Sequence, residues 1–321
     1  MLKIGSLCSG YGGLDMAVEA YFNAETVWMC DNDKYASVVI KERWNLPNLG
    51  DLKAVDWTTV EPIDILTAGY PCQPFSHAGQ RKGENDERHI WPEIKTIISE
   101  LQPKLAILEN VRGHLTLGFK EVLQNLAEIG YDASWAIVRA SDVGAPHRRE
   151  RLFIIAKPSN SNSFRGIIRG QNEEWNQGQS QFESSQCCET IANTNIKGLE
   201  RAWNEAIDIT NGSIANSNGN EQQGNGSMSQ LGRRFNTQLE MRLQRPPHTL
   251  DLNNKLNPTF VEYMMGLPKG WVTDLDISRS QQLKILGNGV VPQQAYYALQ
   301  LLCDTPIIKR EQQMNLTRPV C

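Results

Sequence analysis

The sequence predicts an α/β protein with a doubly wound, mostly parallel β-sheet and a second, smaller domain that is rich in loops. Short apolar segments alternate with amphipathic segments over residues 1–157. A glycine turn, Gly10-Tyr-Gly-Gly13, separates the first apolar segment from the first amphipathic one. This order is typical of parallel sheets with helices on both faces. Beyond Pro158 apolar periodicity fades and Asn, Gln, Gly and Ser dominate, which indicates a change of domain.

The expected elements of the first domain follow one another along the chain. Apolar runs predict strands at 2–7, 26–30, 63–68, 105–108, 135–138 and 152–156. Between them the pattern predicts helices at 14–21, at about 33–44, around 94–101 and around 119–126. Gly130 is suited to end the last of these helices, because glycine readily adopts the left-handed conformation found just past a helix.

Order is expected to return after the polar region. Asn257-Pro258 suits a helix start and Gly266 suits its end, so a short helix is expected between them. Gly287-Asn-Gly289 predicts a turn before a last helix near Pro292. The expected division is 1–157 with 272–305, then 158–271, with a polar tail at 306–321. The polar region contains more large apolar residues than a solvated linker needs, which favours a second domain. These residues are Trp175, Ile191, Trp203, Ile207 and Ile214.

Composition is that of an ordinary globular protein. Charged residues make up 21% and apolar residues 40% of the 321 residues, and no segment approaches the length of a membrane span. Seven irregularly spaced cysteines match neither a disulfide framework nor a zinc motif. We therefore expect a monomeric, reduced, cytoplasmic protein without a metal.

The distribution of charge gives only a weak indication of a nucleic-acid partner. The net charge of −4 does not by itself point to a nucleic-acid partner. One local cluster is basic, with Arg233, Arg234, Arg242 and Arg245 set against the single acid Glu240. Such a cluster suits contacts with phosphates, and it equally suits a solvated surface.

The most informative segment is Gly69-Tyr-Pro-Cys-Gln-Pro-Phe-Ser76, which follows the expected strand at 63–68. Loops at the carboxyl ends of parallel strands carry the chemistry of open α/β sheets. Cys72 there suits a nucleophile, a metal ligand or a small buried residue. The two flanking prolines stiffen the loop, which favours a functional role over packing.

The glycine turn and Asp31 together indicate a nucleoside-bearing cofactor. Glycines let the backbone approach a ligand at the start of a helix, and an acid about twenty residues further on can bind ribose hydroxyls. These features alone do not separate a dinucleotide from S-adenosylmethionine.

Five motifs in a fixed order resemble the DNA cytosine-5 methyltransferase family in its phage and bacterial form. They are Ser6-Leu-Cys-Ser-Gly-Tyr-Gly-Gly13, the Cys72 segment, Glu109-Asn-Val111, Arg148-Arg-Glu-Arg151 and Gly287-Asn-Gly-Val-Val291. The resemblance covers nearly all the chain outside 158–255. It implies a Rossmann-like fold and methyl transfer from S-adenosylmethionine to C5 of cytosine in double-stranded DNA.

The resemblance implies four catalytic residues. Cys72 would attack cytosine C6 as a thiolate, and a free thiol with a pKa of about 8.5 needs help from the site to ionise. Glu109 would hold or protonate N3. Arg149 and Arg151 would lie near the flipped base and its phosphates.

The resemblance also implies a cofactor pocket formed by residues far apart in the sequence. Three positions depart from the usual family pattern: Cys8 replaces Phe, Asn32 replaces an aromatic residue and Gly289 replaces Ser. His147 stands where Gln often precedes the arginine pair. The implied pocket comprises Leu7, Cys8, Gly10, Tyr11, Gly12, Asp31, Asn32, Asp51, Leu52, Pro71, Trp91, Asn288 and Val290.

Duplex DNA buries cytosine C5, so the target base must be flipped out of the stack. The resemblance implies that residues 76–89, with Ser76 and Arg88, form a loop that closes over DNA. Target recognition would fall to residues 158–271, where Arg233, Arg234, Arg242 and Arg245 could bind phosphates.

Three alternatives stay open at this point. A tRNA cytosine-5 methyltransferase shares the motifs, but the long variable region favours DNA. A nicotinamide-dependent oxidoreductase would tolerate the glycine turn and Asp31, yet it gives Cys72 no role. A catalytically silent DNA-binding relative is opposed by the intact Cys72 and Glu109.

Overall fold

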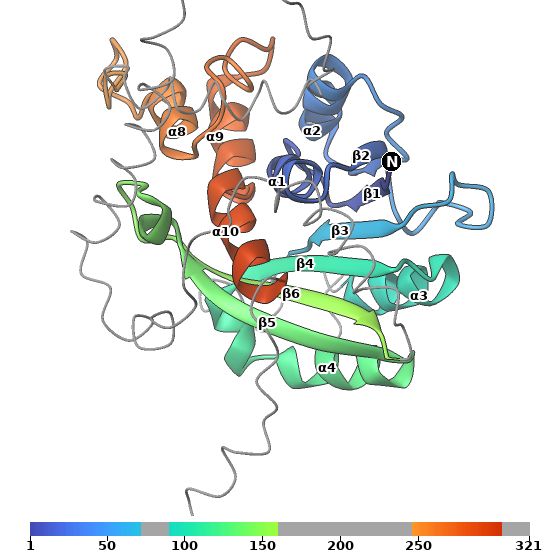
Figure 1. Ribbon diagram of the computed structural model, residues 1–321. Coiled ribbons are helices and arrows are strands. Elements are labelled where there is room, and N and C mark those ends of the chain that lie inside the picture. The colour runs from blue at the N-terminus through green and yellow to red at the C-terminus, as the bar shows by residue number, and fades with distance from the viewer. Residues whose placement is uncertain (72–89, 160–245, 304–321) are drawn as a thin grey trace, which may run out of the picture. The chain divides into compact units, whose positions relative to one another are not determined.

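A computed structural model describes residues 1–71, 90–159 and 246–303 of the chain (Figure 1). Several residues singled out in the sequence lie outside these ranges: Cys72, Ser76, Arg88, Arg233, Arg234, Arg242 and Arg245. The described residues all belong to one compact unit. None of their helices combines the length and apolarity that crossing a membrane would require.

The described part contains six strands and the helices that connect them. The strands are β1 (Lys3–Leu7), β2 (Glu25–Cys30), β3 (Ile65–Gly69), β4 (Leu105–Val111), β5 (Tyr131–Arg139) and β6 (Glu150–Pro158). The α-helices are α1 (Gly13–Phe22), α2 (Lys34–Val39), α3 (Trp91–Leu101), α4 (Phe119–Glu128), α8 (Pro258–Met264), α9 (Arg279–Asn288) and α10 (Pro292–Cys303). Shorter helical turns are η1 (Ile40–Trp44), η3 (Arg112–Thr116) and η4 (Ala140–Val143).

The strands form one sheet in the order β2-β1-β3-β4-β6-β5. Strands β1 to β4 are parallel, whereas β6 runs antiparallel to both of its neighbours, β4 and β5. The predicted mostly parallel sheet is therefore confirmed. Because β6 is reversed, its first residues lie beside the last residues of β4.

Helices cover both faces of the sheet, as the doubly wound prediction required. On one face, α1 and α10 pack on Ile107 and other strand residues, and the rings of Tyr21 and Tyr296 lie 5.6 Å apart. On the other face, α3 and α4 pack on Leu108 and its neighbours. Adjacent residues of β4 thus enter different cores, as expected for the alternation of side chains along a strand.

The C-terminal segment packs against the turn that follows β1. A third apolar cluster combines Tyr11 and Met16 with Trp271, Leu286 and other residues from 265–291. The C-terminal segment therefore folds back beside the turn after β1, as a pocket that combines Asn288 and Val290 with Leu7 and Tyr11 would require. Part of this cluster comes from the range 158–271 assigned above to the second domain, and that division of the chain stays a prediction.

Most helix boundaries agree with the sequence. Asp33 caps α2 by accepting hydrogen bonds from the N–H groups of Tyr35 and Ala36. The predicted helix at 33–44 is continuous, but its second half is the π-helix η1. Asn257 caps α8 through the N–H of Thr259, as predicted.

Helix α9 was not predicted, and the expected turn at Gly287-Asn-Gly289 is wrong in part. Gly287 and Asn288 are the last residues of α9, and only Gly289 leaves the helix. Only Ile285 and Leu286 of this helix are buried. Its sequence therefore has too few apolar residues to show a helical period.

Candidate active site

Strands β3 and β4 end side by side at the predicted catalytic edge. Gly69 is paired with Glu109 in the parallel register. A Cβ atom placed on Gly69 would lie 3.6 Å from Oε2 of Glu109, so the carboxylate lies against the backbone of β3. The chain then runs through Tyr70 and Pro71 into Cys72.

The residues just before Cys72 are firmly held. The Tyr70 hydroxyl is hydrogen-bonded to Nε2 of His114 at 2.9 Å, and Nδ2 of Asn110 donates to the Tyr70 carbonyl at 3.3 Å. The Tyr70 and Trp91 rings pack with their centroids 5.6 Å apart. Both aromatic side chains are buried, so the start of the Cys72 segment is fixed to η3 and α3.

Glu109 forms an ion pair with Arg151. Nε of Arg151 lies 2.9 Å from Oε1 of Glu109, and the two side chains are 16% and 8% exposed. The antiparallel pairing of β4 with β6 brings them together, because Val111 is opposite Arg151. Burial raises the pKa of the Glu109 carboxyl, while the positive charges of Arg151 and Arg149 act in the opposite direction. Such a carboxyl can hold a proton more readily than an exposed one.

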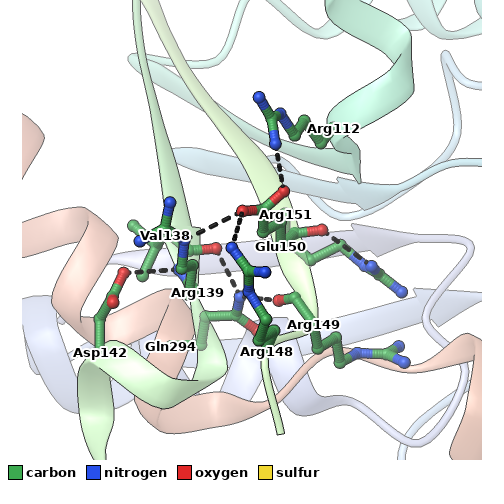
Figure 2. A network of polar contacts seen from close by, with 9 residues as sticks. All are labelled: Arg112, Val138, Arg139, Asp142, Arg148, Arg149, Glu150, Arg151 and Gln294. Carbon is green, nitrogen blue, oxygen red and sulfur yellow. Dashed lines mark hydrogen bonds and ion pairs between the residues drawn. The ribbon is translucent and has the colours of Figure 1, made fainter.

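Arg149 has a different set of partners from Arg151. Its Nη2 donates to the carbonyl oxygens of Gly287 at 2.9 Å and Gly289 at 2.5 Å. Its own carbonyl accepts a hydrogen bond from Nε2 of Gln294 at 2.7 Å (Figure 2). The structure thus brings Arg151 to Glu109, and Arg149 to the C-terminal segment.

The turn after β1 is tied to the end of β2 through Asp31. The Gly10 N–H donates to Oδ2 of Asp31 at 2.8 Å, and the Asp33 N–H donates to Oδ1 at 2.9 Å. Gly10 and Gly12 have φ values of +56° and +82°, which side-chain-bearing residues rarely adopt. Burial raises the pKa of the Asp31 carboxyl.

Asn48 is a site residue that the sequence did not reveal. Its Oδ1 accepts from the N–H groups of Asp31 at 3.0 Å and Gly50 at 3.1 Å. It therefore joins the end of β2 to the segment that carries Asp51 and Leu52. No local pattern marks this asparagine, because its partners come from tertiary structure.

The predicted cofactor residues divide by exposure. Leu7, Tyr11, Gly12, Leu52, Trp91 and Val290 are buried, whereas Cys8, Gly10, Asp31, Asn32, Asp51, Pro71 and Asn288 are partly or fully exposed. The Tyr11 side chain is completely enclosed, and its hydroxyl donates to the Val290 carbonyl at 2.7 Å. The Trp91 indole donates to Asn125 at 3.0 Å. Their expected roles toward a cofactor stay predictions.

Tyr11 also accounts for one departure from the family pattern. A Cβ atom on Gly289 would lie 1.9 Å from Cε1 of Tyr11, so the ring occupies the space that a side chain at position 289 would need. The Tyr11 carbonyl accepts hydrogen bonds from the indoles of Trp44 and Trp271. The glycine and the tyrosine are therefore complementary.

A buried acid lies in the first turn of α1, directly after the glycine turn in the sequence. Asp15 is 1% exposed and accepts hydrogen bonds from the hydroxyls of Ser6 at 2.9 Å and Thr67 at 2.5 Å. Burial raises its pKa to about 6, against the effect of the two hydroxyls. The three residues connect α1 with β1 and β3.

The sequence also did not reveal an arginine cluster around Glu150. Arg112 Nη1 lies 2.6 Å from Oε2 of Glu150, and Arg139 Nε lies 2.9 Å from Oε1 (Figure 2). Arg148 Nη2 is 3.8 Å from the same carboxylate and its side chain is 78% exposed. Three exposed cations thus share one acid at the edge of the sheet where Glu109 lies.

Solved structures have a similar fold. Dnmt2 methyltransferase from S. pombe matches 95% of this chain over 99% of its own, with a TM-score of 0.56 and 18% identity. A DNMT2 mutant from Spodoptera frugiperda gives a TM-score of 0.57 over 94% of this chain and 99% of its own, also at 18% identity. The fold is therefore that of the Rossmann-like methyltransferases.

The family model described as C-5 cytosine-specific DNA methylase matches residues 2–302. The chain belongs to that family. Curated relatives include the Type II methyltransferase M.HhaI of Haemophilus parahaemolyticus, 34% identical over 53% of this chain and 51% of its own length. M.NgoBI of Neisseria gonorrhoeae is 35% identical over 50% of this chain and 52% of its own. The chain thus matches about half the length of these relatives.

Proposed function

We propose that this protein transfers a methyl group from S-adenosylmethionine to C5 of cytosine in double-stranded DNA. The observation that carries the proposal is the buried Glu109–Arg151 pair beside the strand that leads into Cys72. Family membership supports it, and so do the curated relatives that are named Type II methyltransferases.

The residues at the ends of β1 and β2 fit S-adenosylmethionine. Among the described residues, no atom beyond the chain neighbours lies within 4 Å of the place where a Cβ atom of Gly10 would be, so the backbone of the turn is open to close approach there, with α1 beginning directly behind it. A carboxylate can accept about four hydrogen bonds. Asp31 accepts one backbone N–H on each of its two oxygens, so about two acceptor positions are left. Ribose hydroxyls can take the others, while Asn32 and Asp51 offer exposed polar groups. When bound, the cofactor supplies an electrophilic methyl group.

The chemistry assigned to the protein groups begins with Cys72. Its thiolate adds to C6 of the flipped cytosine, which forms a C–S bond and shifts an electron pair toward N3 and C5. Glu109 donates a proton or hydrogen bond at N3, for which its raised pKa is suitable. Arg151 keeps the carboxyl oriented. After C5 is methylated, loss of the C5 proton expels the thiolate and restores the ring.

The Glu150 cluster suits the DNA backbone. Arg112, Arg139 and Arg148 are exposed and bring three positive charges to one carboxylate, so donors remain for phosphate oxygens. Contacts from Ser76, Arg88 and the arginines between 233 and 245 belong to the same proposal. We also propose that residues 158–271 recognise the target sequence.

The test is transfer of tritiated methyl groups from S-adenosylmethionine to unmethylated genomic DNA, with tRNA in parallel. Bisulfite sequencing then maps any product, and Cys72→Ala serves as the inactive variant. We expect label at C5 of cytosine in DNA and none with Cys72→Ala. Label in tRNA alone, or transfer by Cys72→Ala, would refute the proposal.

A further inference from the structure

The side chain of Arg149 binds the end of helix α9. Its Nη2 donates to the carbonyls of Gly287 and Gly289, which flank Asn288. The last carbonyls of a helix lack partners within the helix and carry a partial negative charge. A guanidinium from a distant part of the chain therefore satisfies them well.

The backbone of Arg149 is held in a strained conformation. Its φ is +29°, which is sparsely populated for residues with a side chain. Gln294, which is fully buried, fixes it by donating to the carbonyls of Arg149 and Val138 at 2.7 and 2.8 Å. The surroundings thus determine the direction of the Arg149 side chain.

The segment that Arg149 holds also contacts the turn after β1. The Tyr11 hydroxyl donates to the carbonyl of Val290, and the Tyr11 ring lies against Gly289. Arg149 therefore links this segment to β6, the strand that carries Arg151. One end of the link is the proposed base site, and the other is the proposed cofactor pocket.

We propose that Arg149 is a positioning residue for the cofactor, which it serves by holding Asn288 and Val290 against the turn after β1. This differs from the role implied by the sequence resemblance, in which Arg149 lies near the flipped base and its phosphates. The inference rests on the proposed function, because it requires a cofactor in that pocket. Arg151 and Glu109 remain the residues assigned to the base.

The test compares Arg149→Ala and Arg149→Lys with Arg148→Ala, which removes the neighbouring exposed charge. S-adenosylmethionine is titrated calorimetrically into each protein without DNA. DNA affinity is then measured over a range of salt concentrations without cofactor, and thermal unfolding reports whether each variant folds. Steady-state kinetics give KM for the cofactor and kcat separately.

We expect Arg149→Ala to weaken cofactor binding by about tenfold or more, since two charge-assisted hydrogen bonds are lost. KM for the cofactor should rise much more than kcat falls. Arg149→Lys should recover part of the affinity, because an ammonium can donate to the same carbonyls, and it decides the matter if Arg149→Ala does not fold. Arg148→Ala should leave cofactor affinity unchanged.

The inference is overturned if Arg149→Ala binds the cofactor like the wild type, whether or not its DNA affinity changes. If the slope of log K for DNA against log salt concentration then became shallower by about 0.9, Arg149 would be assigned to a phosphate contact. If the wild type itself binds no S-adenosylmethionine, the proposed function fails, and the inference fails with it. Failure of the proposed function is seen in the wild type, whereas failure of the inference alone is seen only in Arg149→Ala.

Discussion

Arg151 and Glu109 come from strands that run in opposite directions, yet Nε of Arg151 lies 2.9 Å from Oε1 of Glu109. In a fully parallel sheet, the start of one strand and the end of its neighbour would lie at opposite edges. The reversal of β6 brings the two residues to the same edge. The carboxyl therefore combines burial, which favours its protonated form, with a fixed orientation.

Glu109→Gln should retain the fold and lose catalysis. Glutamine can accept the Arg151 hydrogen bond but cannot exchange a proton at N3, so we expect kcat to fall by about 100-fold or more. The measurement is the initial rate of methyl transfer at saturating cofactor and DNA. Glu19→Gln is the matched control, because Glu19 is also buried and accepts a hydrogen bond from the Thr26 N–H. A kcat close to wild type for Glu109→Gln would remove the proposed role.

Gly289→Ala should destabilise the protein through Tyr11. The added methyl would overlap the enclosed ring, and overpacking of this kind costs about 1–3 kcal/mol. In a Tyr11→Leu background the same change should cost less, since the ring is absent. Urea denaturation of the two single variants and the double variant gives the coupling energy. Equal costs in both backgrounds would show that the ring is not the obstacle.

Asp15→Asn should change how stability depends on pH. The Asp15 pKa is raised from 3.8 to about 6, so the folded state binds its proton more tightly than the unfolded state. Its contribution is therefore greatest below about pH 4 and is lost as pH rises through about 6. Between about pH 4.5 and 7.5 the wild type should lose about 2 kcal/mol relative to Asp15→Asn. Denaturation of both proteins at the two pH values measures this, and parallel pH profiles would contradict it.

Arg112→Gln should reduce the salt dependence of DNA binding. If Arg112 neutralises one phosphate, the slope of log K against log salt should become shallower by about 0.9. Arg139→Gln should have a similar effect. Lys104→Gln is the control, because Lys104 pairs with Asp64 just before β4, at the opposite edge of the sheet. A slope for Arg112→Gln equal to that of the wild type would exclude a phosphate contact by Arg112. An equally shallow slope for Lys104→Gln would show that the effect is not specific to the Glu150 cluster.

Local apolar patterns were sufficient to predict most of the sheet. Strands β1 to β4 are short, largely apolar runs, as burial on both faces of a sheet requires. Helices α3 and α4 have the spacing that burial on one face requires. Asn257 also marked the start of α8, because a cap acts on its own neighbours. Helix α9 lacked such a pattern, since its buried residues are few and most of its surface is polar.

The partners of the site residues could not be predicted in the same way. Nothing near Arg149 in the sequence indicates Gly287 as a partner, and nothing near Arg151 indicates Glu109. Asn48 and Glu150 act through tertiary contacts and leave no local signal. Gly289 was noted as a departure from the family pattern, and only the position of the Tyr11 ring explains it. The role of Cys72 stays a prediction from its motif.

The pairing of α1 with α10 has a consequence for synthesis on the ribosome. These helices cover the same face of the sheet, although α1 is the first helix of the chain and α10 is the last one described. A nascent chain that lacks α10 leaves apolar residues of β5 and β6, among them Val138, Phe153 and Ile155, uncovered on that face. Contacts between residues so distant in sequence also slow folding. Overproduction should therefore benefit from slow translation or added chaperones, which protect this face until α10 emerges.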